Sequence, residues 1–569
     1  MGKVINIYQI FTRLFANQNT TNKEYGTIEE NGCTKFNDIT SDALHEIKKL
    51  GITHVWFTGI IRHATCTDYS KHKMPADNPH IIKGRAGSPY AIKDYFDVHP
   101  DYAVNVSKRM EEFEQLLKRT HDAGLQVLID FVPNHVSRTY ESLKRPAGIQ
   151  NLGEFDDTKV AFKPSNNFYY IPYEDFILPK DIYFPYTEGH EPYTEYPAKA
   201  TGNDVFSNQP SINDWYETVK LNYGIDYQNL WHEHFEQIPD TWVRMYEILE
   251  FWAHKGVDGF RCDMAEMVPV KFWAWVIPQI KEINPDILFI AEVYNPDYYK
   301  IYSKRGKFDY LYDKVGLYDV LRLIIEGYGS AKYISDVWRG LDDLSPKMLR
   351  FLENHDEQRI ASDYFAVNPE NAKAAMIAAA TLHSGPLMLY FGQEIGEKGM
   401  DKEGYSGQDG KTSIFDYWGL SEFNKWVNNG KFDGGQLSTS QKELREFYKH
   451  LLQLRLKTEA LRNGMFYDLM WQNYSGNVNS DKIFAFVRYT DAHKLIIIIN
   501  FDLEHAYSFK LMLGEHAFET IGIPSSGTCK VRDIYEGTFS QTYSYESILS
   551  DGMSLDIPKN SALILEIQE

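Results

Sequence analysis

The sequence predicts an α/β protein built on a closed (β/α)8 barrel, a TIM barrel, with a small domain inserted after the third strand and a C-terminal antiparallel β-sandwich domain. Three observations predict this fold. Apolar strand-like runs alternate with amphipathic helix-like runs about eight times, the number of units that closes a barrel. The alternation breaks between about residues 136 and 227, and helical periodicity ends near residue 470.

The elements of the barrel follow from hydrophobic periodicity. Strands are predicted at Val4–Phe11, Gly51–Phe57 and Leu125–Phe131, separated by helices at Ser41–Leu50 and Lys108–Ala123. After residue 227 the predicted elements are helix Thr241–Lys255, a strand ending at Asp263, helix Val270–Ile283, strand Ile287–Glu292, a strand near Tyr310, strand Met348–Asp356, helix Asn371–Leu382, strand Pro386–Tyr390 and helix Gln441–Leu456. This order indicates parallel strands covered by helices.

The chain is divided into three predicted domains. Residues 1–135 and 228–469 are assigned to the barrel, residues 136–227 to the inserted domain and residues 470–569 to the C-terminal β domain. Structureless loops as long as 136–227 are uncommon in compact chains, so this Tyr-, Pro-, Asn- and Gly-rich segment predicts a small domain. Short apolar runs between turns, without helical periodicity, predict the last domain.

Composition excludes several classes of partner. The 569-residue chain has a formal net charge of −20, which argues against a nucleic-acid or anionic-membrane partner. No apolar run is long enough to span a membrane, and the four cysteines lack the spacing of a disulfide framework or a zinc site. Since the N-terminal stretch is predicted to be a strand, the expected location is the cytoplasm, or the periplasm if a signal peptide has been removed.

Four predicted strands end in carboxylates, at Asp130, Asp263, Glu292 and Asp356. Barrel enzymes keep their active sites at the carboxyl ends of the strands, so these side chains are expected in one cleft. Arg261 shares a strand face with Asp263 and is expected to keep it ionised. Retaining glycoside hydrolysis uses one ionised carboxylate as nucleophile beside one protonated carboxylic acid as general acid.

The sequence also allows two other uses of these residues. Arg261 and Asp263 together could form a purely structural ion pair at a strand end. Clustered carboxylates also bind metal ions, although the Arg261 guanidinium would repel a cation. The hydrolase reading requires no cofactor.

The sequence motifs resemble those of glycoside hydrolase family 13, the α-amylase family, with members of the bacterial α-amylase and neopullulanase type. The matching segments occur in the family order and are Asp130–His135, Gly259–Asp263, Ile290–Val293, Phe351–Asp356 and Gly385–Glu394. The family architecture is the same barrel with an inserted domain and a C-terminal β domain. The resemblance therefore implies a retaining hydrolase of α-1,4-glucosidic bonds in starch-derived glucans or maltooligosaccharides.

The resemblance also implies roles for the acidic residues. Asp263 corresponds to the nucleophile, Glu292 to the general acid/base, and Asp356 to the residue that binds hydroxyls of the sugar being cut. Arg261 corresponds to the residue that orients the nucleophile.

Three further residues are implied to contact the same sugar. His135 and His355 correspond to hydrogen-bonding histidines, and Tyr90 to the tyrosine that stacks on the ring. The alternative for each is a purely structural role, as a strand-end histidine for His135 and His355 or a core tyrosine for Tyr90.

Two departures from the family pattern affect the expected specificity and metal content. Ala91 follows Tyr90 where exo-acting glucosidases of the family usually carry an Asp, which favours a cleft open to longer glucans. Asn134 matches an oxygen ligand of the calcium of many α-amylases, but Lys220 stands where a second ligand is expected. Since an ammonium cannot ligate a cation, that calcium is doubtful, while a calcium on Asp401 or Asp409 is left open.

Other functions fit the same motifs. A cyclodextrinase, a neopullulanase, a transglycosylase or an exo-acting α-glucosidase would use the same acids. A protein of a different class, an inactive glucan-binding relative, is disfavoured because Asp263, Glu292 and Asp356 are all present.

Overall fold

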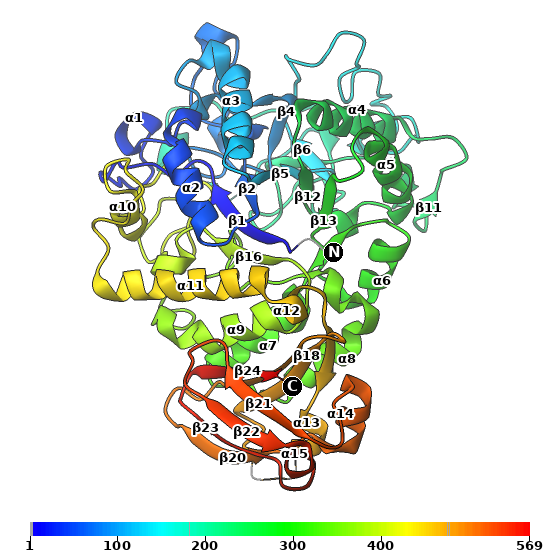
Figure 1. The fold of residues 1–569 in the computed structure, drawn as a ribbon. Helices are drawn as coiled ribbons and strands as arrows, with labels where there is room; N and C mark the ends of the chain where they lie inside the picture. The colour runs from blue at the N-terminus through cyan, green and yellow to red at the C-terminus, as the bar shows by residue number, and fades with distance from the viewer. Residues whose placement is uncertain (1–3, 181, 475, 477, 569) are drawn as a thin grey trace.

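The computed structural model describes residues 4–180, 182–474, 476 and 478–568. Within them, eight parallel strands form one sheet in the order β15-β14-β13-β12-β5-β2-β1-β16 (Figure 1). A parallel bridge between Arg350 and Leu387 joins the two end strands and closes the barrel. The strands are β1 (Asn6–Phe11), β2 (His54–Thr58), β5 (Gln126–Phe131), β12 (Gly259–Cys262), β13 (Leu288–Ala291), β14 (Tyr310–Tyr312), β15 (Met348–Leu349) and β16 (Leu387–Tyr390). The predicted barrel is confirmed.

Side-chain alternation along the strands divides the apolar residues into two sets. One set fills the barrel interior and includes Trp56, Leu128, Ile290, Tyr312 and Met388, all at most 1% exposed. The alternate residues point outward and pack against the surrounding helices. These helices are α2 (Ser41–Lys49), α3 (Arg109–Asp122), α4 (Asp240–Lys255), α5 (Val270–Ile283), α6 (Pro296–Lys304), α7 (Asp319–Ile325), α8 (Tyr333–Leu341), α9 (Lys373–Thr381), α10 (Ser421–Val427), α11 (Thr439–Lys457) and α12 (Glu459–Asn463).

The seventh strand is shorter than predicted. The sequence predicts a strand over Met348–Asp356, whereas β15 covers only Met348–Leu349 and its pairing ends at Arg350. Beyond it the Asn354 Oδ1 accepts hydrogen bonds from the backbone N–H groups of Asp356 and Glu357, at 2.8 and 2.9 Å. This Asn-centred turn replaces the ladder with local bonds, so Asp356 lies on a turn above the strand.

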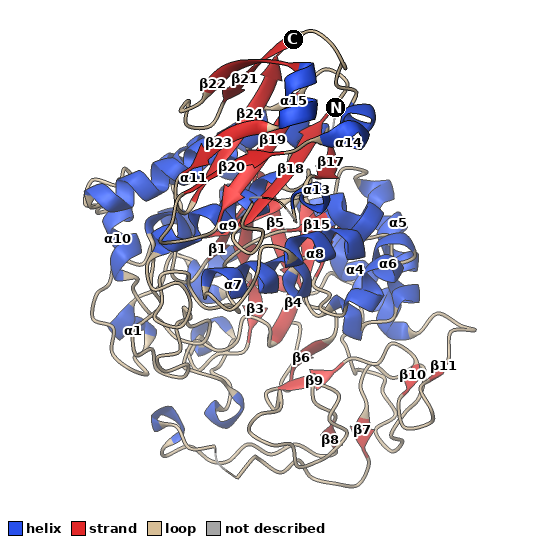
Figure 2. Ribbon diagram, turned by 90° about the horizontal axis from the view of Figure 1, so that it is seen from below, coloured by secondary structure: helices blue, strands red, loops and turns tan. Residues whose placement is uncertain are grey.

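Small two-stranded sheets occupy the segment between β5 and α4. They pair β6 (His135–Ser137) with β9 (Thr218–Lys220), β7 (Tyr170–Ile171) with β8 (Ala198–Lys199), and β10 (Ile225–Asp226) with β11 (His232–Glu233). Figure 2 shows this segment at the end of the molecule opposite the C-terminal strands. The bounds 136–227 for an inserted domain stay a prediction, and the hairpin β10–β11 continues past them to Glu233.

The C-terminal region contains a six-stranded sheet in the order β17-β18-β19-β24-β21-β22 and the pair β20–β23. Its strands are β17 (Met465–Asp468), β18 (Ile483–Tyr489), β19 (Lys494–Asn500), β20 (Tyr507–Leu511), β21 (Thr528–Asp533), β22 (Ser540–Ser544), β23 (Met553–Ile557) and β24 (Ser561–Gln568). Helix α9 of the barrel packs against β19 and β24. The first strand, β17, starts before residue 470, where the domain boundary was predicted.

The expectation that helices end near residue 470 is wrong. Short helices α13 (Met470–Asn473), α14 (Gly514–Ile521) and α15 (Tyr545–Asp551) lie among the C-terminal strands. Each is at most eight residues long, too short for periodicity to separate it from a loop. Among the described residues no helix has the length and hydropathy needed to cross a membrane. The cytoplasmic location stays a prediction.

Candidate active site

The site is built around Arg261, the third residue of β12. Its side chain points into the barrel and is 1% exposed, with the guanidinium 5.4 Å from the ring centroids of Trp56 and Tyr90 and 5.6 Å from that of Tyr312. The Nε of Arg261 also donates to the Tyr312 hydroxyl at 3.2 Å. Packed between three rings, the guanidinium has little freedom to move.

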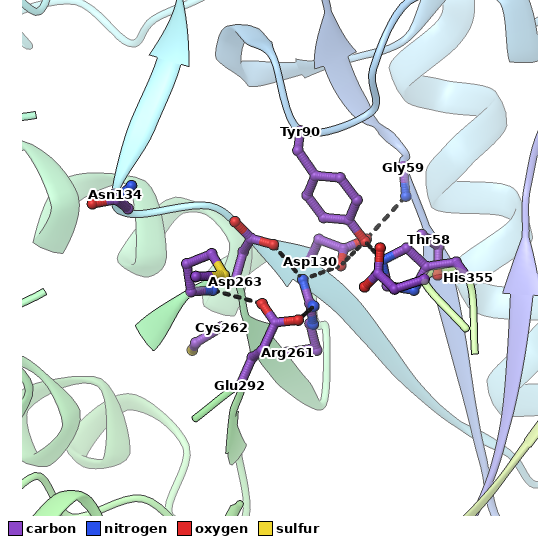
Figure 3. Close-up of polar contacts among 12 residues, drawn as sticks. Thr58, Gly59, Tyr90, Asp130, Asn134, Arg261, Cys262, Asp263, Glu292 and His355 are labelled. Atoms are coloured by element: carbon purple, nitrogen blue, oxygen red, sulfur yellow. Dashed lines mark hydrogen bonds and ion pairs between the residues drawn. The ribbon is translucent and has the colours of Figure 1, made fainter. Parts of the chain in front are cut away.

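Three carboxylates surround this one guanidinium (Figure 3). Arg261 Nη1 lies 2.6 Å from Asp263 and 3.7 Å from Asp130, and its Nη2 lies 2.5 Å from Glu292. The carboxylates belong to the carboxyl ends of β5, β12 and β13, neighbours in the sheet with Arg261 in register with Asp130. The sequence predicts that Arg261 orients Asp263 and is supported by Asp130, and the structure shows that it contacts Glu292 as well.

Glu292 is held by two further hydrogen bonds. Its Oε2 accepts from the backbone N–H of Met264 at 2.7 Å, and its Oε1 accepts from the Tyr294 hydroxyl at 2.8 Å. Met264 adopts a left-handed backbone conformation, with φ 42°, that turns the chain directly after Asp263. Strain of this kind in a non-glycine residue is typical of functional sites, and here it aims an amide at Glu292.

Burial and mutual repulsion change the titration of the cluster. Burial raises the pKa of Asp263 well above its usual value, the Arg261 charge opposes this rise, and the nearby Glu292 charge adds to it. Burial raises the pKa of Asp130 to about 6, again against the effect of Arg261. The expectation that crowding raises at least one pKa agrees with this direction. The expected low pKa of Asp263 does not, because burial outweighs the effect of the Arg261 charge, which Asp263 shares with Asp130 and Glu292.

His355, Asp356 and Tyr90 form a second group beside the first. The Gln9 amide donates to His355 Nδ1 at 2.9 Å, so the ring proton is assigned to Nε2. That nitrogen lies 2.6 Å from the Tyr90 hydroxyl and 3.2 Å from the Asp356 carboxylate. Burial lowers the pKa of His355 to about 3, with the Arg261 charge acting in the same direction, which keeps the imidazole neutral.

His135 lies across the site on β6, with its ring 5.1 Å from the Trp215 ring. Burial lowers its pKa to about 3, and the positive charges of Lys220 and Lys83 lower it further. A neutral imidazole of this kind can both donate a hydrogen bond to a sugar hydroxyl and accept one.

A cavity of about 260 Å³ lies over these groups. Six of the seven predicted site residues line it, namely Tyr90, His135, Asp263, Glu292, His355 and Asp356. The seventh, Arg261, lies beneath them and reaches the cavity through the carboxylates that it holds. Chain segments far apart in sequence thus converge at the carboxyl ends of the barrel strands.

Several lining residues were not predicted. Tyr294 follows Glu292 by two positions, so strand alternation could have indicated it. Lys83, Trp215, Glu217 and Phe415 also line the cavity, and they lie in segments without a motif that marks them.

Ala91, on which the open-cleft prediction rests, does not line the cavity. It is 2% exposed and packs in a small apolar cluster with Ala64 and Ile82. The open cleft stays a prediction, because Ala91 lies away from the cavity surface.

Lys220 occupies the position at which the family calcium was considered. Its ammonium lies 2.7 Å from Asn134 Oδ1 and 2.5 Å from Asp204 Oδ1, and its side chain is 2% exposed. The ammonium takes both of these oxygens and places a positive charge between them, so the residues present do not fit a metal ion there. Within the described part of the chain, no group of three or more His, Cys, Asp or Glu residues is arranged for a metal.

Comparison with known sequences identifies the family. The sequence model of the alpha-amylase catalytic domain matches residues 9–464. The chain belongs to the α-amylase family. Alpha-amylase 3 of Dictyoglomus thermophilum is 25% identical over 503 residues, covering 82% of this chain and 81% of that protein. A cyclomaltodextrinase of a Bacillus species is 24% identical over 533 residues, covering 91% of this chain and 76% of that protein.

Solved structures of α-amylase family proteins share the fold. A maltogenic α-amylase, AmyB, from Thermotoga neapolitana has a TM-score of 0.61 and 20% identity, with 99% of both chains covered. The α-amylase of Geobacillus thermoleovorans complexed with acarbose has a TM-score of 0.63 and 20% identity, covering 99% of this chain and 98% of that one. This α-amylase family member is thus a glycoside hydrolase that acts on α-1,4-glucans, as the sequence motifs predict.

Proposed function

We propose that this enzyme hydrolyses α-1,4 bonds of maltooligosaccharides with retention of anomeric configuration, using Asp263 as nucleophile and Glu292 as general acid/base. The observation that carries the proposal is the Arg261 guanidinium, whose two terminal nitrogens contact the two carboxylates at 2.6 and 2.5 Å. Two carboxylates on one guanidinium are close neighbours, whereas inverting enzymes separate theirs to admit a water. The separation expected for retention is about 5–5.5 Å.

The reaction proceeds in two displacements. Asp263 attacks C1 of the sugar while Glu292 gives its proton to the glycosidic oxygen, so a C1–Oδ bond forms as the glycosidic C–O bond breaks. Glu292 then takes a proton from water, whose oxygen attacks C1 and releases Asp263.

Groups around the cavity would position the sugar. His355 and Asp356 line the cavity side by side, and the Asp356 carboxylate can accept hydrogen bonds from neighbouring sugar hydroxyls. Tyr90 offers a ring face that is fixed by its hydrogen bond to His355. Such contacts gain strength as the ring flattens toward the oxocarbenium-like transition state.

The stereochemistry of azide products tests the two roles. Proton NMR of the first product should show the α-anomer. In Asp263→Ala, azide should replace the nucleophile and give a β-glycosyl azide. In Glu292→Ala, azide should attack the glycosyl-enzyme and give the α-glycosyl azide. A β-anomer as first product of the unchanged enzyme, or the opposite pair of azides, would contradict the assignment.

We further propose that the barrel and the inserted segment are joined without calcium at Asn134. Lys220 supports this, because its fixed charge stands between the Asn134 and Asp204 oxygens. Catalysis by Asp263 and Glu292 needs no metal or other cofactor.

A further inference from the structure

The residues that line the catalytic cavity make two separate sets of contacts. Glu292, which would protonate the leaving oxygen, is hydrogen-bonded to the Met264 amide and the Tyr294 hydroxyl. Lys83, Trp215, Glu217 and Phe415 line the same cavity, and the Trp215 ring lies 5.1 Å from that of His135, whose pKa the Lys83 charge lowers. From these separate contacts we infer that the second set lies at the end of the cavity away from Glu292.

Lys83 and Glu217 form an ion pair at this second end, with Lys83 Nζ 2.9 Å from Glu217 Oε1. Their side chains are only 13% and 7% exposed. Glu217 Oε2 is buried and has no hydrogen-bond partner in the structure. Because a buried acceptor without a partner is costly, this oxygen is a place where a ligand hydroxyl would be stabilised.

The pair offers the donors and acceptor that a sugar needs. An ammonium carries three N–H donors, and Lys83 directs one of them to Glu217. Its remaining donors and the unpartnered Glu217 oxygen can together bind a hydroxyl that both accepts and donates. Charge-assisted hydrogen bonds of this type are stronger than neutral ones.

The wall behind the pair is made of packed backbone and aromatic rings. The backbone N–H of Ala86 donates to the Phe415 carbonyl at 3.1 Å, which ties the segment before Tyr90 to the segment after β16. A Cβ on Gly84 would lie 2.2 Å from the same carbonyl oxygen, so the two segments are in direct contact. The Tyr405 ring packs 5.0 Å from the Phe415 ring and 5.1 Å from the Phe184 ring.

We infer that Lys83 and Glu217 bind the non-reducing terminal glucosyl unit, so that the enzyme releases glucose from chain ends. This rests on the proposed function, which places C1 between Asp263 and Glu292. C4 lies across a pyranose ring from C1, so the 4-hydroxyl points to the cavity end opposite Glu292. There a further sugar on O4 would meet the ion pair and the wall behind it.

Capped and free substrates test the inference directly. Maltotriose labelled at its reducing end should give unlabelled glucose and labelled maltose as its first products. A nitrophenyl maltoheptaoside capped by a 4,6-ethylidene group should be cut at least about 100-fold more slowly than the uncapped compound. Early release of labelled glucose with unlabelled maltose, or similar rates on the capped and uncapped compounds, would overturn the inference.

Variants identify the residues responsible. Maltose lacking the 4-hydroxyl of its non-reducing unit should react about 10- to 100-fold more slowly in the unchanged enzyme, from loss of a charge-assisted hydrogen bond. In the double variant Lys83→Ala/Glu217→Ala this penalty should shrink to less than about threefold, because both partners of the hydroxyl are then gone. A merely structural pair would leave the penalty unchanged, which would also overturn the inference.

The matched control is Lys93→Ala. Lys93 pairs with Asp77 at 2.5 Å with side-chain exposures of 13% and 6%, yet neither residue lines the cavity. The 4-deoxy penalty should be unaffected in this variant.

A separate measurement distinguishes failure of this inference from failure of the proposed function. If no free-ended substrate is hydrolysed, or configuration inverts, the proposed function fails. Calorimetric binding of maltose and 4-deoxymaltose to Asp263→Asn still tests the Lys83–Glu217 pair in that case, and equal affinities would refute it.

Discussion

Replacing Lys220 by methionine tests how the inserted segment is joined to the barrel. The change keeps an unbranched side chain, one atom shorter, and removes the charge between Asn134 and Asp204. Breaking a buried ion pair costs about 3–5 kcal/mol. Asp204 is 33% exposed and regains hydration, so we expect a smaller loss, about 2–3 kcal/mol in the free energy of unfolding.

The corresponding change in melting temperature follows from the size of the unit. For a barrel covering residues 9–464, the entropy of unfolding is about 1 kcal/mol per kelvin. Lys220→Met should therefore melt about 2–3 °C lower than the unchanged protein. Differential scanning calorimetry with EDTA and with Ca²⁺ should give the same melting temperature for both proteins.

A charge reversal gives the complementary result. Lys220→Asp would place a carboxylate beside the Asn134 and Asp204 oxygens, so its melting temperature should rise when Ca²⁺ is added. Lys93→Asp is the control, since it breaks a pair of similar burial without this oxygen set and should not respond. If EDTA lowers the melting temperature of the unchanged protein by more than about 5 °C, and Ca²⁺ restores it, the role given to Lys220 is refuted.

Three further predictions concern the site and the pH dependence of stability. Asp130→Asn removes a charge that raises the pKa of Asp263, so the acidic limb of the kcat/KM profile should move to lower pH, by up to about one unit; an upward shift would count against this. Burial raises the pKa of the Glu353 carboxyl from 4.5 to about 7. Between these pH values native protein keeps a proton that unfolded protein has lost, so the free energy of unfolding should fall by roughly 3 kcal/mol as the pH rises through them. Glu353→Gln should flatten that decline in urea midpoints measured across the range. Tyr90→Ala should lower kcat/KM about 10- to 100-fold through lost stacking, with little change in melting temperature. A large fall in melting temperature alongside the lower kcat/KM would indicate a core role for this ring.

The barrel was predictable because its signals are local. Each strand is an apolar run bounded by turns, and Asp130, Asp263 and Glu292 follow such runs directly. Parallel pairing then brings their carboxylates together without any side-chain detail. The same reasoning fails where local side-chain hydrogen bonds compete with strand pairing. At Asn354 such bonds to the following backbone amides end the seventh strand early.

The electrostatics of the site could be predicted only in part. Alternation places Arg261 and Asp263 on one face, and the 2.6 Å contact agrees. The contact to Glu292 crosses between strands and depends on register, which periodicity does not give. The Met264 amide reaches Glu292 through a left-handed residue that no glycine marks. For these reasons the sequence indicates that the Arg261 charge acts on Asp263, but does not indicate that Glu292 shares it.

Whether a residue lies on a strand end or on a loop explains which properties could be predicted. The reacting groups stand on strand ends, whose relative positions are set by the sheet and vary little with the loops. Lys83 and Glu217 stand on segments 134 residues apart, brought together by loop contacts such as that of Ala86 with Phe415. Relatives of similar identity carry the names α-amylase and cyclomaltodextrinase. Since such proteins share the barrel, we infer that the choice between internal and terminal cleavage resides in loops of this kind, and the terminal-unit site inferred for this chain, the Lys83–Glu217 ion pair, joins two of them.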